Sequence, residues 1–222
     1  DYDVDGVTST ALLVQVLRAL NANVGAYIPN RFDEGYGLNM DALSQLSKEG
    51  VNLVITVDCG IRSVDEVAHA RDLGLALIIT DHHHPGDMLP PALAIINPKQ
   101  KGDTYPEKYL AGVGIAYKIA QALLEQRSTN ELTSEHLLDL VALGTVADLA
   151  PLEGENHALV RKGLRVIRNA QRQGLVSLAA VASVNIQEVS AMNIGFSLGP
   201  RLNAAGRLDS ALAAYDLLME TD

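Results

Sequence analysis

The segment VNLVITVDCG, residues 51–60, contains the pattern that decides the fold. Its first seven residues form a near-continuous apolar run, which is typical of a strand buried on both faces of a parallel sheet. A second apolar run at residues 75–80 has the same character, and the residues between the two runs have helical spacing. Ser63 is a candidate N-cap for that helix, and Glu66 would complete a capping box with it. A strand, a helix and a strand in this order predict a βαβ unit and a parallel sheet.

The same alternation continues on both sides of this unit. We expect further strands at residues 24–28 and 92–96, and helices at 8–21 and 39–48. Beyond Pro98 the pattern changes to a polar loop followed by a series of helices, expected at residues 110–126, 134–144, 156–173, 176–182 and 209–220. The sequence therefore predicts an α/β layer over residues 1–150 and a helical section over residues 151–222.

The composition predicts a folded globular chain, with 48% hydrophobic and 20% charged residues in a length of 222. A net charge of −10 and an aromatic content of 4% argue against a large basic or aromatic surface for nucleic acid. Bound cations would reverse the sign of the charge locally. The single cysteine excludes an internal disulfide and fits a reducing cytoplasm. No signal peptide or membrane span is visible, and because the first motif starts at Asp1 we expect a fragment that lacks its first strand.

Acidic and histidine clusters follow the predicted strands and precede the first predicted helix. Asp58 ends the run at residues 51–57, and Asp81 with three histidines ends the run at residues 75–80. DYDVDG occupies residues 1–6. Ligands of open parallel sheets bind at the carboxyl ends of the strands, so these clusters are expected along one edge. Carboxylates with imidazole suit Mn²⁺ or Mg²⁺, and two such ions form the usual clamp for phosphoryl displacement by a water.

Each of these features also has a simpler interpretation. The DxDxDG pattern could be a calcium loop, but the twelfth position, where an EF-hand requires Glu, is Leu12. Asp58 could be only a helix cap, and Cys59 a small buried thiol. The glycines at 112 and 114 could cradle a phosphate, although helix packing is the favoured role. Four arginines at helical spacing, residues 161–172, could follow a nucleic-acid backbone, and a solvated face is slightly favoured.

Five segments together carry a family resemblance. The segments DYDVDG (1–6), VDCG (57–60), TDHH (80–83) and GTVAD (144–148) resemble successive motifs of the DHH phosphoesterase family. GPRLNAAGR (199–207) resembles a further motif of its RecJ branch. The resemblance implies a three-layer α/β phosphoesterase domain with a parallel sheet, and then a helical extension toward a smaller second domain. It also implies metal-dependent phosphodiester hydrolysis, as a 5′→3′ single-stranded DNA exonuclease releasing 5′-mononucleotides in repair and recombination.

Site residues follow from the resemblance, position by position. Two divalent cations, Mn²⁺ or Mg²⁺, would be held by Asp3, Asp5, Asp58, His82 and Asp148, with Asp58 bridging both ions. Asp81 would orient a neighbouring imidazole or its loop, and His83 would lie near the scissile phosphate. Asp1 is a further possible ligand. Arg201, Asn203 and Arg207 would bind phosphate oxygens, and Pro200 is expected to prevent a continuous helix there.

Three alternatives remain open from the sequence. A family member of this kind could hydrolyse small nucleotides or oligoribonucleotides, or could be a non-catalytic nucleic-acid-binding module. A dinucleotide-binding oxidoreductase is a distant third, because no Gly-x-Gly-x-x-Gly follows the first strand position. The resemblance implies single-stranded nucleic acid as the partner, with repair proteins such as a helicase or a single-strand-binding protein, in the cytoplasm and without a membrane.

Overall fold

A short parallel sheet forms the centre of the α/β half. The computed structural model describes residues 2–29, 35–127, 129, 131–208 and 211–220, with only the backbone at 206–208. The strands are β1 (Leu53–Ile55), β2 (Ala76–Thr80) and β3 (Ala94–Ile96), in the order β1-β2-β3. Val54 pairs with Leu77, and Ile79 pairs with Ile95. All three strands run in parallel, as the apolar runs predict.

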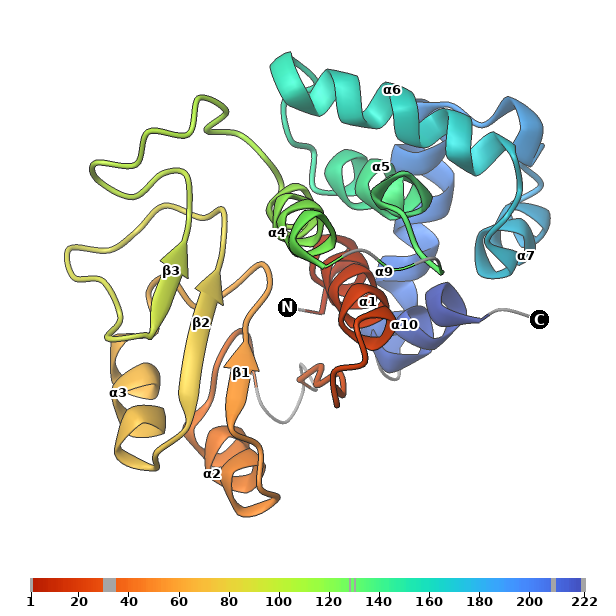
Figure 1. Cartoon of the computed structure of the whole chain (residues 1–222). Coiled ribbons are helices and arrows are strands. Elements are labelled where there is room, and N and C mark those ends of the chain that lie inside the picture. The colour runs from red at the N-terminus through yellow and green to blue at the C-terminus, as the bar shows by residue number, and fades with distance from the viewer. Residues whose placement is uncertain (1, 30–34, 128, 130, 209–210, 221–222) are drawn as a thin grey trace.

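Two helices cover one face of this sheet. They are α2 (Met40–Lys48) and α3 (Val64–Asp72). Leu43 of α2 and Val67 of α3 are fully buried against Leu77 and Ile79 of β2. Figure 1 shows α3 beside the lower part of β2 and α2 below β1. This small core holds the strands in place and leaves their carboxyl ends facing the rest of the molecule.

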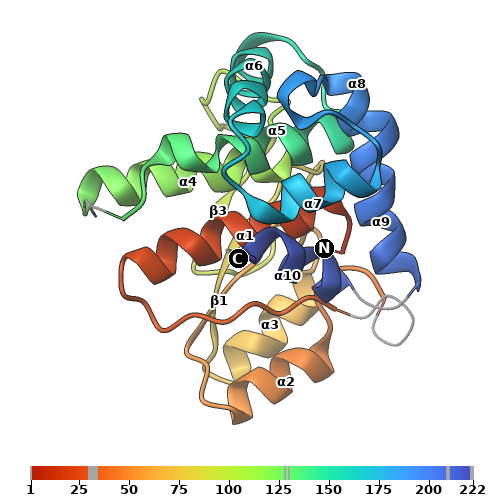
Figure 2. The same ribbon diagram turned by 90° about the vertical axis from the view of Figure 1, so that its right-hand side faces the viewer.

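The other face meets the main core. Here α1 (Val4–Ala19) and α4 (Gly112–Gln126) lie next to the sheet, and α1 also contacts α5 (Leu138–Ala147) and α10 (Ala211–Met219) (Figure 2). The remaining helices complete this half: η1 (Ser134–Leu137), α6 (Gly154–Arg168), α7 (Gln173–Val181), η2 (Ile186–Glu188), α8 (Ala191–Asn193), the π-helical turn η3 (Ile194–Leu198) and α9 (Gly199–Leu208). The predicted α/β class with a parallel sheet and a helical section is confirmed. A boundary near residue 150 stays a prediction.

The strand expected at residues 24–28 is absent. No strand is assigned between residues 22 and 29, although Ile28 is buried. A cavity of about 710 Å³ is lined by this segment, by residues 51–57 and by parts of α1 and α2. Backbones of paired strands lie about 4.8 Å apart, and no such pairing is assigned to this segment. The prediction of a strand here was wrong, and of residues 24–28 only Ile28 is buried.

Two local predictions are also wrong. Helix α9 starts at Gly199 and continues through Pro200, directly after the π-helical turn, in which the Gly199 N–H donates to the Ile194 carbonyl. Pro200 is the second residue of α9, where its missing amide is tolerated, and the wider π-turn precedes it. Ser63 precedes α3, but its side chain makes no capping hydrogen bond, so the expected capping box is not formed.

Candidate metal centre

Five acidic or imidazole side chains, those of Asp5, Asp58, His82, His83 and Asp148, meet at the carboxyl edge of the sheet. Asp5 comes from the first turn of α1, Asp58 follows β1, His82 follows β2, and Asp148 ends α5. Their ligand atoms form two overlapping groups in which every atom lies within 4.8 Å of the others. The groups are Asp58 with His82 and His83, and Asp5 with His82 and Asp148.

The contact between Asp58 and His82 has the geometry expected of two ligands of one cation. His82 Nε2 lies 3.0 Å from Asp58 Oδ1, and both residues are buried. Within the described residues, neither atom has a hydrogen-bond partner. Ligands at right angles on an ion with bonds of about 2.1 Å lie about 3 Å apart. Because buried polar atoms are rarely left unsatisfied, this pair fits a bound divalent cation.

Asp58 also has an unusual backbone conformation. Its φ of 60° lies in the left-handed region, which aspartate tolerates better than most residues with a side chain. Strained conformations of this kind gather at functional sites. The conformation therefore supports a functional role for Asp58 rather than a simple helix cap, because α3 begins only at Val64.

Asp5 is held by the start of α4. Its two carboxylate oxygens accept the N–H groups of Gly112, at 2.7 Å, and Val113, at 2.8 Å. These amides lie at a helix N-terminus, where the helix dipole favours an anion. The glycine pair at 112 and 114 therefore opens a helix that binds a carboxylate of this chain. A Cβ on Gly112 would lie 2.7 Å from Asp58 Cβ, so any larger residue there would have to displace Asp58 or the start of α4.

The carboxylates raise one another's pKa values. Burial raises the pKa of Asp5 well above its ordinary value, and the charges of Asp58 and Asp148 add to the shift. Burial and the charge of Asp3 do the same for Asp58. Burial also raises the pKa of Asp148. Such a cluster of acids is stable in its ionised form only with cations among them.

Asp81 is directed toward His83. Asp81 Oδ1 lies 2.7 Å from His83 Nδ1, and Oδ2 accepts the N–H of Ile61 at 2.9 Å. Burial raises the pKa of Asp81, but the hydrogen bonds from His83 and Ile61 outweigh this and lower it overall. An ionised Asp81 therefore fixes the ring of His83, whose side chain is 45% exposed and reaches to 4.0 Å from Asp58 Oδ1.

Asp3 and Asp148 lie at helix ends beside the cluster. Asp3 caps α1, because its Oδ1 accepts the N–H of Gly6 at 3.0 Å, and it belongs to neither group of ligand atoms. Asp148 Oδ2 lies 3.9 Å from His82 Nδ1. Gly144 allows α5 to approach closely, since a Cβ there would meet Thr8 Oγ1 and lie 3.1 Å from Asp5 Oδ1. Asp3 as a ligand stays a prediction.

The residues expected to bind phosphate lie on α9, outside the cluster. Asn203 Oδ1 accepts the N–H of Val4 at 3.1 Å, so it ties α9 to the start of α1. Arg201 is exposed, and its Nη1 donates to the Ser197 carbonyl at 2.8 Å. The side chain of Arg207 and the whole of Asp1 lie outside the described residues.

Tyr36 lies at the site and was missed by sequence reasoning. Its hydroxyl donates to the Asp58 carbonyl at 3.4 Å. Its ring stands edge-on to those of Tyr2 and His83, with centroids 6.1 and 6.4 Å away. The sequence feature that could have identified Tyr36 is its position between two glycines in GYG, residues 35–37. Both glycines adopt a positive φ and present the tyrosine on a turn.

The arginine stripe does not form one surface. Arg172 is mostly buried, and its Nε lies 2.6 Å from Asp139 Oδ2. Arg168 donates from Nε and Nη2 to the Val189 carbonyl. Arg168 and Arg172 thus have partners within the protein, so this half of the stripe is neither a free nucleic-acid surface nor a purely solvated face.

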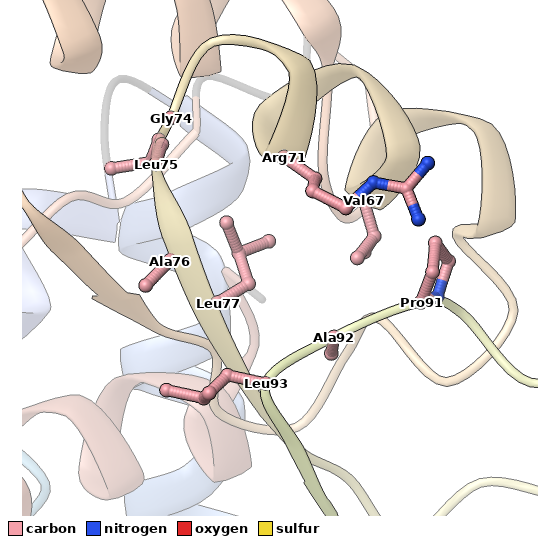
Figure 3. Close-up of a pocket in the computed structure, with 9 residues that line it drawn as sticks. All are labelled: Val67, Arg71, Gly74, Leu75, Ala76, Leu77, Pro91, Ala92 and Leu93. Carbon is pink, nitrogen blue, oxygen red and sulfur yellow. The ribbon is translucent and has the colours of Figure 1, made fainter.

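A second hollow, of about 390 Å³, lies at the opposite end of β2 (Figure 3). Leu75, Leu77 and Leu93 line it together with Arg71. It contains no carboxylate or imidazole, so it lacks the groups for metal binding. The candidate centre is therefore the carboxyl edge of the sheet.

Comparisons with known proteins agree with this geometry. Residues 1–145 match the model of the DHH family, N-terminal domain. The single-stranded-DNA-specific exonuclease RecJ of Bacillus subtilis is 50% identical over 222 residues, which are 100% of this chain and 28% of that protein. The RecJ protein of Escherichia coli is 46% identical over 230 residues, covering 99% of this chain and 40% of its own length.

Solved structures show the same similarity. A crystal structure of exonuclease RecJ bound to manganese superposes with a TM-score of 0.89 at 39% identity, over 100% of this chain and 55% of that one. RecJ from Thermus thermophilus in complex with Mn²⁺ gives a TM-score of 0.84 at 37% identity, over 100% and 31%. This chain thus spans less than half the length of the curated relatives above. With the family model matching most of its length and the acidic motifs meeting at one edge, the chain belongs to the DHH family.

Proposed function

We propose that this chain is the metal-binding part of a phosphodiester hydrolase, a 5′→3′ single-stranded DNA exonuclease that releases 5′-mononucleotides. The observation that carries the proposal is the buried contact of Asp58 with His82, two unsatisfied ligand atoms at the carboxyl edge of a parallel sheet. The RecJ names of the relatives support the choice of single-stranded DNA as the substrate.

Two divalent cations, Mn²⁺ or Mg²⁺, would be held by the cluster. The proposed ligands are Asp3, Asp5, Asp58, His82 and Asp148, with Asp1 as a possible further one. When bound, such ions polarise the phosphodiester and lower the pKa of the attacking water. The manganese and magnesium complexes of solved RecJ structures support this choice of ions.

The chain's own residues would then position the substrate. Asp81 holds the His83 ring by its Nδ1, which leaves Nε2 for a hydrogen bond to a non-bridging phosphate oxygen. Arg201 and Arg207 would bind phosphates further along the strand. Asn203 already bonds to the first turn of α1, so its proposed part is to hold the DxD motif in place.

We place this activity in DNA repair and recombination, in the cytoplasm, with a helicase or a single-strand-binding protein as partner. The names of the relatives, which act on single-stranded DNA, support the setting. The one cysteine, Cys59, is buried and has no second cysteine in this sequence with which to form a disulfide, which suits a reducing compartment. In the described part of the chain, no helix has both the length and the apolarity that crossing a bilayer requires.

A cleavage assay tests the proposal. The intact protein is given a 5′-labelled single-stranded oligonucleotide with Mn²⁺, Mg²⁺ or EDTA, beside Asp58→Ala and the exposed control Asp65→Ala. We expect metal-dependent release of labelled mononucleotide, a loss of at least about a thousandfold in Asp58→Ala, and no change in Asp65→Ala. Full activity of Asp58→Ala would refute the site. Cleavage limited to dinucleotides would indicate a small-substrate phosphoesterase, and Mn²⁺ binding without any cleavage would indicate a binding module.

A further inference from the structure

Five described helices end in the same backbone motif. In each, the N–H of one residue donates to the carbonyl three residues before it, and the N–H of the next residue donates to the carbonyl five residues before it. This pair of hydrogen bonds defines the Schellman motif. The residue between helix and loop then adopts a positive φ of 55° to 82°. These residues are Asn21, Gly50, Gly74, Leu149 and Ser183. Glycine or a small polar residue occupies four of the positions, as expected, and leucine occupies the fifth.

Neither conformation nor packing explains a leucine at 149. A left-handed backbone brings Cβ close to the following carbonyl, so large apolar side chains are disfavoured there. Burial could offset this cost, but Leu149 is 85% exposed. When a residue breaks a local rule without a structural gain, a functional contact is the usual reason.

The location of Leu149 suggests what that contact is. It directly follows Asp148, whose Oδ2 lies 3.9 Å from His82 Nδ1. The N–H groups of Leu149 and Ala150 donate to the carbonyls of Val146 and Thr145, so the backbone that presents the side chain is fixed. Leu149 therefore directly follows a candidate ligand in the chain, on a backbone that these two hydrogen bonds hold in place.

We infer that Leu149 is a substrate-contacting residue whose side chain packs against the nucleobase adjacent to the phosphate held at the metal centre. This inference rests on the function proposed above. An alkyl side chain has no hydrogen-bonding group for phosphate or sugar hydroxyls, and the face of a base is the largest apolar surface of a nucleotide. The contact is independent of base identity, which suits an enzyme that degrades a strand residue by residue.

Three variants of the intact protein test the inference. Leu149→Asn and Leu149→Gly remove the apolar group and fit the left-handed backbone better, while Leu149→Met keeps the apolar group as the matched control. For the first two we expect the melting temperature to rise by about 2 °C. The dissociation constant of a labelled oligonucleotide, measured by fluorescence anisotropy in Ca²⁺, should rise about five- to tenfold. Mn²⁺ affinity should not change, and Leu149→Met should behave as wild type.

An oligonucleotide with an abasic 5′-terminal nucleotide identifies the contact. For the wild-type protein, the loss of affinity caused by the abasic nucleotide should be about as large as the loss caused by Leu149→Asn on the normal oligonucleotide. Leu149→Asn itself should bind the abasic oligonucleotide little more weakly than it binds the normal one. Wild-type affinity in Leu149→Asn, or full additivity of the two losses, would overturn the inference. A lower melting temperature would show that Leu149 packs against another part of the protein instead. Failure of the wild type to bind or cleave DNA would refute the proposed function itself, and that result is visible without any variant.

Discussion

Replacement of Gly112 by alanine tests whether close packing of α4 on the metal centre is required. The added Cβ would lie 2.7 Å from Asp58 Cβ, 2.9 Å from its Oδ1 and 3.0 Å from its Cγ. The first distance is roughly 0.8 Å shorter than the smallest favourable carbon–carbon separation of about 3.5 Å. Asp58 or the first turn of α4 must therefore move, and the amide that binds Asp5 moves with that turn.

The expected effect falls on metal affinity more than on stability. A ligand set tolerates displacements of about 0.5 Å, and disturbing the support of a ligand costs about 10- to 100-fold in affinity, or about 1.4–2.8 kcal/mol. Overpacking costs about 1–3 kcal/mol of unfolding free energy, and because Gly112 is the first residue of α4, the preference of helix interiors for alanine over glycine offsets little of this cost. Gly112→Ala should thus stay folded and bind Mn²⁺ weakly.

Titration of Mn²⁺ by calorimetry, with urea unfolding of the metal-free protein, measures both quantities. Gly114→Ala is the matched control, because the three atoms nearest to its Cβ all belong to the Leu110 side chain, at 3.2 Å and beyond, and none to a candidate ligand. The reasoning is refuted if Gly112→Ala binds Mn²⁺ as tightly as wild type. Equal losses of Mn²⁺ affinity in Gly112→Ala and Gly114→Ala would also refute it. The cause would then be a general disturbance of α4 and not the contact with Asp58.

Two further predictions concern pH and stability. In the metal-free protein the pKa values of Asp5, Asp58 and Asp148 lie above their ordinary value of 3.8. At pH values between 3.8 and these raised pKa values, the folded protein therefore binds more protons than the unfolded chain. These groups therefore add stability as pH falls through that window, whereas Mn²⁺ requires them ionised. The gap between melting temperatures in Mn²⁺ and in EDTA should narrow from about pH 7.5 to about pH 5.5, and a constant gap would contradict the pKa assignments. Arg172→Ala leaves Asp139 buried without its partner and should cost about 3–5 kcal/mol in urea unfolding. The exposed Arg165→Ala should change stability by less than about 0.5 kcal/mol, and equal effects would contradict the structural role of Arg172.

Periodicity predicted the elements whose burial is local and regular. The apolar runs before Asp58 and Asp81 became β1 and β2. β2 is largely buried, but β1 exposes Leu53, so the expectation that it is buried on both faces is wrong. Residues 24–28 form no strand, because the hydrophobicity of a short segment does not determine which backbone lies alongside it. The helix through Pro200 depends on the π-turn before it, which has no sequence signature of its own.

The metal centre was predictable where it follows strand ends and not elsewhere. Asp58 and His82 converge because parallel strands end at one edge. Asp148 ends a helix, and only the close approach of α5 to α1 at Gly144 brings it there, so the family resemblance was needed to choose it. The bond of Asp5 to Gly112 spans 107 residues, and no local pattern encodes such a contact.

The left-handed backbone of Asp58 narrows the substitutions that this position can accept. Among residues with a side chain, mainly Asn and Asp tolerate that conformation, and of these only Asp carries a charge. Glutamate, the usual conservative exchange for aspartate, keeps the charge but fits the backbone poorly and moves the carboxylate outward by one methylene. Glycine would relieve the backbone and remove the ligand. Conformation and charge therefore both favour aspartate at this position, and each common exchange for it loses one of the two.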